Sequence, residues 1–325
     1  MTAGGAVPVR HQEFRVEVPG GVLHAVRSGR GPDVVLLNAG ATDARMWAAE
    51  AEALAGRHRV TRYDDRGTGP HSTAPTGPWT YTADLLAVLD ALGIGRAVLI
   101  GASDGGRKAL DAALAHPERV AGLVLVGAAM HLPDLTEAEQ PLYEELIAAL
   151  RPRAEAVERG DLEAAIAVDL DVWCPRATPV VRAALTELYR ASPAFLLGLP
   201  HPPEEPAHTG IAHLDRIDAP ALVLTGEHDT PFTHLCHRRL AAGLPRVRAE
   251  VVPGADHLVN LSRPAEFARR VTAFLGGLRG GALDGSVDGS VDGSGAGWGL
   301  HPWPVAGLSS PAAPGTGSAA GPGAR

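Results

Sequence analysis

The sequence predicts an α/β fold with a largely parallel sheet, and three observations support this prediction. Short apolar runs rich in Val, Leu and Ile alternate with segments of helical spacing between residues 34 and 126, which is the pattern of strands joined by crossover helices. A turn of the form Gly-x-Ser-x-Gly at residues 101–105 joins one such run to a helix. Strand-like runs return at residues 221–225 and 247–252, after a long stretch of helical patterns.

The elements before and after this alternation are also predictable. Residues 14–18 and 22–26 are predicted to pair as a hairpin around the turn at 19–21, Pro-Gly-Gly. The apolar run at 34–37 is the next strand. The last predicted helix has one apolar face, formed by Phe267, Val271, Phe274 and Leu275.

A candidate nucleophile lies in the Gly-x-Ser-x-Gly turn. Ser103 follows the apolar run at 97–100 and precedes residues 106–114, which have helical spacing. Gly101 and Gly105 allow the strand and helix backbones to pass closely at so tight a turn. The serine hydroxyl is then expected to stand out of the sheet at a helix N-terminus, whose N–H groups stabilise developing negative charge.

A serine nucleophile needs a base, and the base needs an orienting acid. Asp229 follows the predicted strand at 221–225, and His257 follows the predicted strand at 247–252. Because the carboxyl ends of parallel strands meet at one edge of a sheet, both side chains are expected to approach Ser103.

Further motifs accompany these residues. They are Tyr63-Asp64-Asp65-Arg66-Gly67-Thr68-Gly69, Asp171-Val172-Trp173, Gly226-Glu227-His228-Asp229 and Gly254-Ala255-Asp256-His257. Together with the chain order of serine, acid and histidine, they resemble the α/β-hydrolase family, in its branch of capped esterases, enol-lactonases and haloperoxidase-like enzymes. The resemblance covers about residues 12–278. It implies a mostly parallel eight-stranded sheet with helices on both faces and a helical cap inserted after strand 6.

The resemblance also indicates the oxyanion hole. Asn38-Ala39 stands where the family carries His-Gly, and the next backbone N–H, of Gly40, is expected to be one donor, with a one-residue ambiguity between Gly40 and Ala41. The N–H of Asp104 is expected to be the other. Asp104 departs from the family, which more often has a neutral residue there. A carboxylate is unfavourable beside an oxyanion, so we expect the Asp104 side chain to turn away.

The function implied is a serine hydrolase of small-molecule carboxylic esters or lactones. Ser103 attacks the carbonyl, His257 is the general base and Asp229 the orienting acid, with no metal or organic cofactor required. Asp256 competes with Asp229 by its position, but the family pattern favours Asp229, and we expect Asp256 to point to solvent. Three alternatives stay open: acyl transfer, cofactor-free perhydrolysis, and a ligand-binding protein that retains the triad without turnover.

The long helical stretch predicts the cap. Thr178 is a typical N-cap residue with Pro179 at the first helical position. More than eighty residues without a strand signal are long for one crossover, although ordinary crossover helices are the alternative. The apolar stripe of the helix that begins here is Val181, Leu185, Leu188 and Tyr189.

These observations divide the chain into four predicted segments. The hydrolase core comprises residues 1–130 and 216–279, and the cap comprises residues 131–215. Residues 280–325 form a tail rich in Gly, Ser, Pro and Ala, which is expected to be disordered because it has little apolar surface to bury.

Composition narrows the function classes. The chain has 325 residues, of which 45% are hydrophobic and 20% charged, and its net charge is −8 without basic clusters; this argues against a nucleic-acid partner. Two cysteines make no disulfide framework. Met1 to Gln12 lacks a signal-peptide pattern, and no apolar run approaches the ~20 residues of a membrane span. Cytoplasmic residence is therefore the default expectation.

Two patterns could suggest a metal, and neither is expected to hold one. His228, His234, Cys236 and His237 crowd one segment, but solvated or core histidines are the more common explanation for such spacing. The Asp-Gly-Ser repeat at 284–294 differs in period from calcium-binding nonapeptide repeats.

Overall fold

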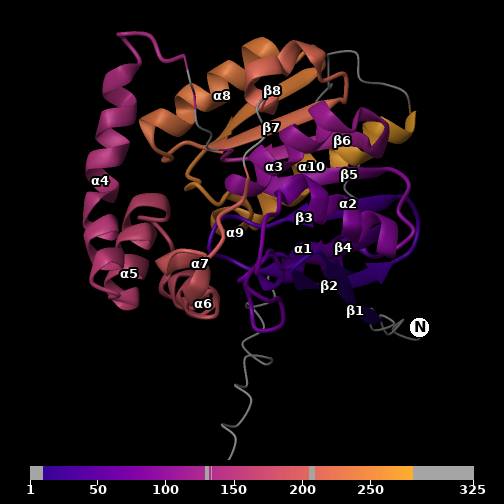
Figure 1. Cartoon of the computed structure of the whole chain (residues 1–325). Coiled ribbons are helices and arrows are strands. Elements are labelled where there is room, and N and C mark those ends of the chain that lie inside the picture. Colours follow the sequence, from indigo (N-terminus) through magenta and orange to yellow (C-terminus); the bar gives the residue numbers. More distant parts are fainter. Residues whose placement is uncertain (1–9, 129–131, 133, 205–208, 281–325) are drawn as a thin grey trace, which may run out of the picture.

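A single sheet forms the centre of the protein (Figure 1). The computed structural model describes residues 10–128, 132, 134–204 and 209–280. In this part of the chain, eight strands follow the order β1-β2-β4-β3-β5-β6-β7-β8. They are β1 (His11–Val18), β2 (Gly21–Gly29), β3 (Asp33–Leu37), β4 (Arg59–Tyr63), β5 (Ala97–Ala102), β6 (Val120–Val126), β7 (Ala221–Gly226) and β8 (Val247–Val252).

The sheet is parallel except at β2. This strand pairs antiparallel with β1 in the predicted hairpin and antiparallel with β4, and all other neighbours pair parallel. The prediction of a mostly parallel eight-stranded sheet is confirmed for the described residues.

Helices cover both faces because the central strands are apolar on both sides. Val35 and Leu99 belong to one core, with α2 (Tyr81–Ala91), α3 (Asp104–Ala115) and α8 (Pro231–Gly243). The alternate residues belong to the other core, with α1 (Ala48–Leu54) and α10 (Pro264–Gly280). The predicted apolar face of the last helix lies in this second core and comprises Phe267, Val271, Phe274 and Leu275. Burial of each such side chain contributes about 1.5–3 kcal/mol to the stability of the fold.

Four α-helices of the described chain follow β6 and precede β7. They are α4 (Gln140–Glu158), α5 (Leu162–Trp173), α6 (Pro179–Arg190) and α7 (Pro193–Leu197), and Figure 1 shows them grouped beside the sheet. Thr178 caps α6 as predicted, since its Oγ1 accepts a hydrogen bond from the Val181 N–H at 3.3 Å. The division of the chain into core, cap and tail stays a prediction.

Short elements complete the described chain, namely η1 (Ala44–Trp47), η2 (Pro117–Arg119), η3 (Gly210–Arg216) and α9 (Val259–Ser262). Helix α10 extends to Gly280, and the rest of the predicted tail lies outside the described residues, as does the Asp-Gly-Ser repeat. Among the helices of the described chain, none combines the length and apolarity that crossing a bilayer requires.

Glu50 is a buried acid on the face of the sheet that α1 and α10 cover. It lies on α1, is 3% exposed, and its Oε2 has no hydrogen-bond partner among the described residues. Burial raises the pKa of Glu50 to about 7, although Asn260 and Arg62 lower it. Folding therefore favours the protonated form of this side chain.

This shift predicts a loss of stability as the pH rises. Above the ordinary pKa of 4.5 the unfolded chain releases the Glu50 proton, and the folded chain retains it until about pH 7. Glu50 should thus lower the free energy of unfolding by on the order of 3 kcal/mol between these values. Glu50→Gln should remove that dependence, as measured by urea unfolding at pH 4.5, 6 and 8. Glu52→Gln, exposed on the same helix, is the control, and identical pH dependence in wild type and Glu50→Gln would contradict the prediction.

Candidate active site

Ser103 lies at a strained turn between β5 and α3. Its backbone has φ 51° and ψ −117°, a left-handed conformation that costs a non-glycine residue about 1–3 kcal/mol. A Cβ on Gly101 would lie 2.2 Å from the carbonyl oxygen of Gly105, and a Cβ on Gly105 would lie 2.3 Å from that of Leu37. Both motif glycines are therefore required by backbone contact, and the Ser103 N–H is held by the carbonyl of Val126 at 2.7 Å.

The structure brings the three predicted triad residues together. The Nε2 of His257 lies 2.8 Å from the Oγ of Ser103, and its Nδ1 lies 2.9 Å from each carboxylate oxygen of Asp229. Asp229 follows β7 and His257 follows β8, as the strand pattern predicts. The Asp229 side chain is fully buried and also accepts the N–H of Thr230 at 2.7 Å. With an ionised Asp229, Nδ1 of His257 donates and Nε2 accepts the serine proton.

The expectation that Asp256 points to solvent is wrong. Asp256 is 1% exposed, and its Oδ2 accepts the N–H of Arg176 at 3.1 Å. Its own N–H donates to the Oγ of Ser262 at 3.1 Å. Burial raises the pKa of the Asp256 carboxyl. The turn after α5 lies over this residue and shields it from water, a contact that the local sequence does not reveal.

A pocket of about 210 Å³ opens above Ser103. Its floor includes Gly40, Ala41, Asp104 and His257, from the carboxyl edge of the sheet. Its roof comes from the four helices between β6 and β7, and comprises Leu150, Arg153, Asp169, Trp173, Tyr189 and Phe195. The pocket is thus formed jointly by the sheet and by the segment predicted as a cap.

Both candidates for the first oxyanion donor line this pocket. Gly40 and Ala41 lie in a turn closed by a 3.2 Å hydrogen bond from the Thr42 N–H to the Ala39 carbonyl. Ala41 has φ 60°, so the backbone here is also left-handed. Asn38, which replaces the family's histidine, donates from Nδ2 to the Tyr63 carbonyl at 2.7 Å and so ties this loop to β4.

The Asp104 carboxylate is paired with two cations. Its Oδ1 lies 2.8 Å from Arg107 Nε, and its Oδ2 lies 2.9 Å from Lys108 Nζ. Lys108 is 3% exposed and also binds Asp65 Oδ2 at 2.8 Å. Burial raises the pKa of Asp104, but Lys108 and Arg107 outweigh it and lower the pKa to about 2. The charge of Asp104, which stands where the family more often has a neutral residue, is therefore compensated. Lys108 was not identified as its partner from the sequence, although the two residues have i, i+4 spacing.

Trp173 joins the roof of the pocket to His257. Its ring centroid lies 4.5 Å from that of His257, and its carbonyl accepts the His257 N–H at 3.3 Å. Trp173 and Phe195 both line the pocket, whereas Trp47 is buried in the core. The sequence favours packing roles for Trp47, Trp79, Trp173 and Phe195 and does not indicate which of them line the pocket.

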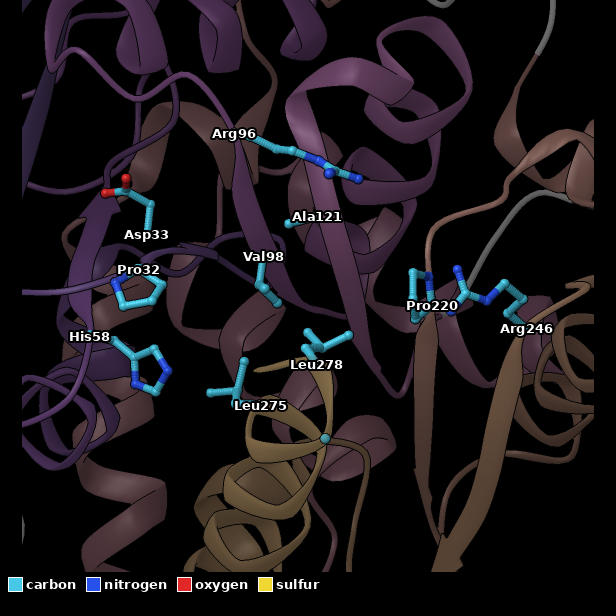
Figure 2. A pocket seen from close by; sticks show the side chains of 11 residues that line it. Pro32, Asp33, His58, Arg96, Val98, Ala121, Pro220, Arg246, Leu275 and Leu278 are labelled. Carbon is cyan, nitrogen blue, oxygen red and sulfur yellow. The ribbon is translucent and has the colours of Figure 1, made fainter. Parts of the chain in front are cut away.

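A larger cavity, of about 480 Å³, lies at the opposite edge of the sheet. Figure 2 shows Pro32, Pro220 and Arg246, which precede β3, β7 and β8, with Leu275 and Leu278 of α10 between them. Ligands of open α/β sheets bind at the carboxyl edge, and this cavity lies at the amino edge. Its described lining contains no serine, threonine or cysteine, so it offers no nucleophile.

The clustered histidines have other contacts. His237 Nδ1 lies 3.0 Å from Thr225 Oγ1, and His234 Nε2 lies 3.3 Å from the Glu227 carbonyl. Within the ranges that the structure describes, no three or more His, Cys, Asp or Glu side chains are grouped to hold a metal ion.

Known proteins resemble the chain over most of its length. A protein named as a carbamate hydrolase, RutD, of Caulobacter sp. strain K31 is 28% identical over 79% of this chain and 96% of its own length. The carboxylesterase YbfK of Bacillus subtilis is 26% identical over 84% of this chain and 90% of its own length.

Solved structures agree with these relatives. The enol-lactonase of Burkholderia xenovorans LB400 has a TM-score of 0.65 and 29% identity, over 81% of this chain and all of its own. The model of the alpha/beta hydrolase fold family matches residues 32–264. This is more than half of the sequence, and the chain therefore belongs to the alpha/beta hydrolase family.

Proposed function

We propose that the protein is a serine hydrolase that cleaves a small-molecule carboxylic ester or lactone. One observation carries the proposal: Ser103 Oγ, His257 and Asp229 form a continuous hydrogen-bonded series with contacts of 2.8 and 2.9 Å at the floor of a pocket. Acyl transfer through a covalent intermediate requires a nucleophile, a base and an orienting acid in this geometry.

Each group has a role in the proposed mechanism. His257 Nε2 takes the proton of Ser103 as Oγ attacks the carbonyl, and it later returns that proton to the leaving group. Asp229 holds Nδ1–H of His257 and stabilises the imidazolium that forms. The N–H of Asp104, with that of Gly40 or Ala41, would stabilise the tetrahedral oxyanion. Water activated by His257 then releases the acid.

Two further observations support a small ester or lactone. A pocket of about 210 Å³ beneath helices α4 to α7 suits a small molecule rather than a polymer. The relatives are named for carbamate, carboxylic ester and enol-lactone chemistry, and in each case an acyl carbonyl is the group attacked. We take esters and lactones as the proposed substrates and a carbamate, which would also acylate Ser103, as the comparison substrate.

Substitution of Ser103 tests the proposed nucleophile. Ser103→Ala should lower kcat for short aryl esters at least ~10³-fold, because it removes the nucleophile. A fluorophosphonate probe should label the wild type at Ser103 and leave the variant unlabelled, as read by intact mass. Ser192→Ala, a buried serine outside the pocket lining, is the control for nonspecific labelling. Undiminished turnover in Ser103→Ala would refute the proposal, and products that carry an added alcohol or amine in place of water would indicate acyl transfer.

Substitutions at Asp229 and Asp256 distinguish which of these two acids orients His257. Asp229→Asn should preserve folding but favour the wrong tautomer of His257, with a loss of kcat on the order of 10⁴. Asp256→Asn should lower kcat less than ~10-fold, because the Asp256 carboxylate accepts the N–H of Arg176 and has no hydrogen bond to the imidazole, and its backbone N–H donates to Ser262 Oγ. Ester kinetics on both variants, with melting temperatures as the folding check, measure the difference. The reverse order of losses would mean that Asp256 is the functional acid.

A further inference from the structure

An ion pair interrupts the apolar roof of the pocket. Arg153 of α4 donates from Nε to Oδ2 of Asp169 on α5 at 2.9 Å, and both residues line the pocket together with Ser103. Their roof neighbours are Leu150, Trp173, Tyr189 and Phe195. Among the described lining residues, Arg153 is the only arginine or lysine. Placing two charged groups in such a roof costs desolvation energy, which a ligand contact would offset.

The guanidinium of Arg153 has N–H donors that its contact with Asp169 does not use. A guanidinium carries five N–H groups in a planar fork, and the contact with Asp169 uses Nε. Among the described residues, the hydrogen bonds of Arg153 leave the Nη1 and Nη2 groups without a second acceptor. The edge formed by these two nitrogens matches the two oxygens of a carboxylate, and such bidentate, charge-assisted pairs are about twice as strong as neutral hydrogen bonds.

Arg153 is the more accessible partner of this ion pair, and both partners line the pocket. The Arg153 side chain is 31% exposed, whereas that of Asp169 is 7% exposed. Burial raises the pKa of Asp169, while Arg153 and the side chain of Trp173 lower it. Asp169 therefore acts as a buried support that fixes the plane of the guanidinium.

The other acid in the lining does not reverse this polarity. The Asp104 carboxylate is paired with Arg107 and Lys108 at 2.8 and 2.9 Å. Its negative charge is thus compensated before any ligand enters. An anionic ligand group would meet Arg153 as the exposed charge of the roof.

We propose that the substrate carries a carboxylate in addition to its scissile ester or lactone, and that Arg153 binds this carboxylate through Nη1 and Nη2. The inference rests on the proposed function of the same pocket. It makes Arg153 a specificity-determining residue and Asp169 its positioning residue. Neutral esters without a carboxylate would then be turned over with a higher KM.

The test compares esters that differ only in charge. Monomethyl esters of succinic, glutaric and adipic acid are each paired with the corresponding methyl ester amide, and 4-carboxyphenyl acetate is paired with 4-carbamoylphenyl acetate. These pairs place the carboxylate on the acyl side or on the alcohol side of the scissile bond. At pH 8, kcat/KM for the acid should exceed that for the amide at least ~10-fold in one or more pairs, and the difference should lie mainly in KM.

Substitution of the arginine should remove this preference. Arg153→Met should lower the acid-to-amide ratio of kcat/KM at least ~10-fold, while Arg153→Lys should retain part of the preference for the acid. Arg151→Met, exposed two residues earlier on the same helix, is the matched control and should leave the ratio unchanged. Competitive inhibition of amide hydrolysis by the free dicarboxylates gives a second readout, with a Ki that rises in Arg153→Met.

The outcomes separate the two proposals. Turnover without preference for the acid in every pair, or a preference that Arg153→Met and Arg153→Lys both retain, overturns the carboxylate site and leaves the hydrolase intact. The absence of turnover with every ester, together with the absence of Ser103 labelling, overturns the hydrolase and the carboxylate site with it. Melting temperatures identify a variant that fails to fold, in which case Arg153→Lys and the dicarboxylate inhibition of the wild type decide.

Discussion

The left-handed backbone of Ser103 is the constraint on which the rest of the site depends. A residue with φ 51° between a strand and a helix forces the two backbones into contact, and the distances at Gly101 and Gly105 leave no space for a side chain. This geometry exposes the hydroxyl at the carboxyl edge of the sheet and directs the first turn of α3 toward the same place. His257 and Asp229 reach that place because β8 and β7 end there.

The buried cation of Lys108 compensates the charge of Asp104, an acid that is unusual at this position of the turn. Lys108 contacts both Asp104, next to Ser103, and Asp65 of the loop after β4. The preceding residue of that loop, Asp64, accepts the N–H of Ala44 at 2.8 Å and thereby holds the segment that contains both candidate oxyanion donors. The loop after β4 thus links the two sides of the proposed oxyanion hole. Removing one partner of such a buried pair leaves an uncompensated charge, which costs about 3–5 kcal/mol.

The sequence was sufficient for the fold and for the three side chains that meet at the triad, because strand ends of a parallel sheet converge and the Gly-x-Ser-x-Gly turn has one geometry. It was not sufficient for contacts made across the fold. Asp256 was expected in solvent because nothing near it in the chain indicates that the turn after α5 covers it. Arg153 and Asp169 look like ordinary charged residues of surface helices, and only the packing of α4 against α5 brings them into the roof.

Two hydrogen bonds join the loop that contains His257 to the end of α5 and to the turn that follows it. The His257 N–H is bonded to the carbonyl of Trp173, and the Asp256 side chain is bonded to the N–H of Arg176. A displacement of α5 would either stretch these two bonds or carry the His257 backbone with it. In the first case the displacement costs two hydrogen bonds. In the second case the His257 imidazole moves away from Ser103 together with α5, so the position of this helix and the contact between His257 and Ser103 depend on each other.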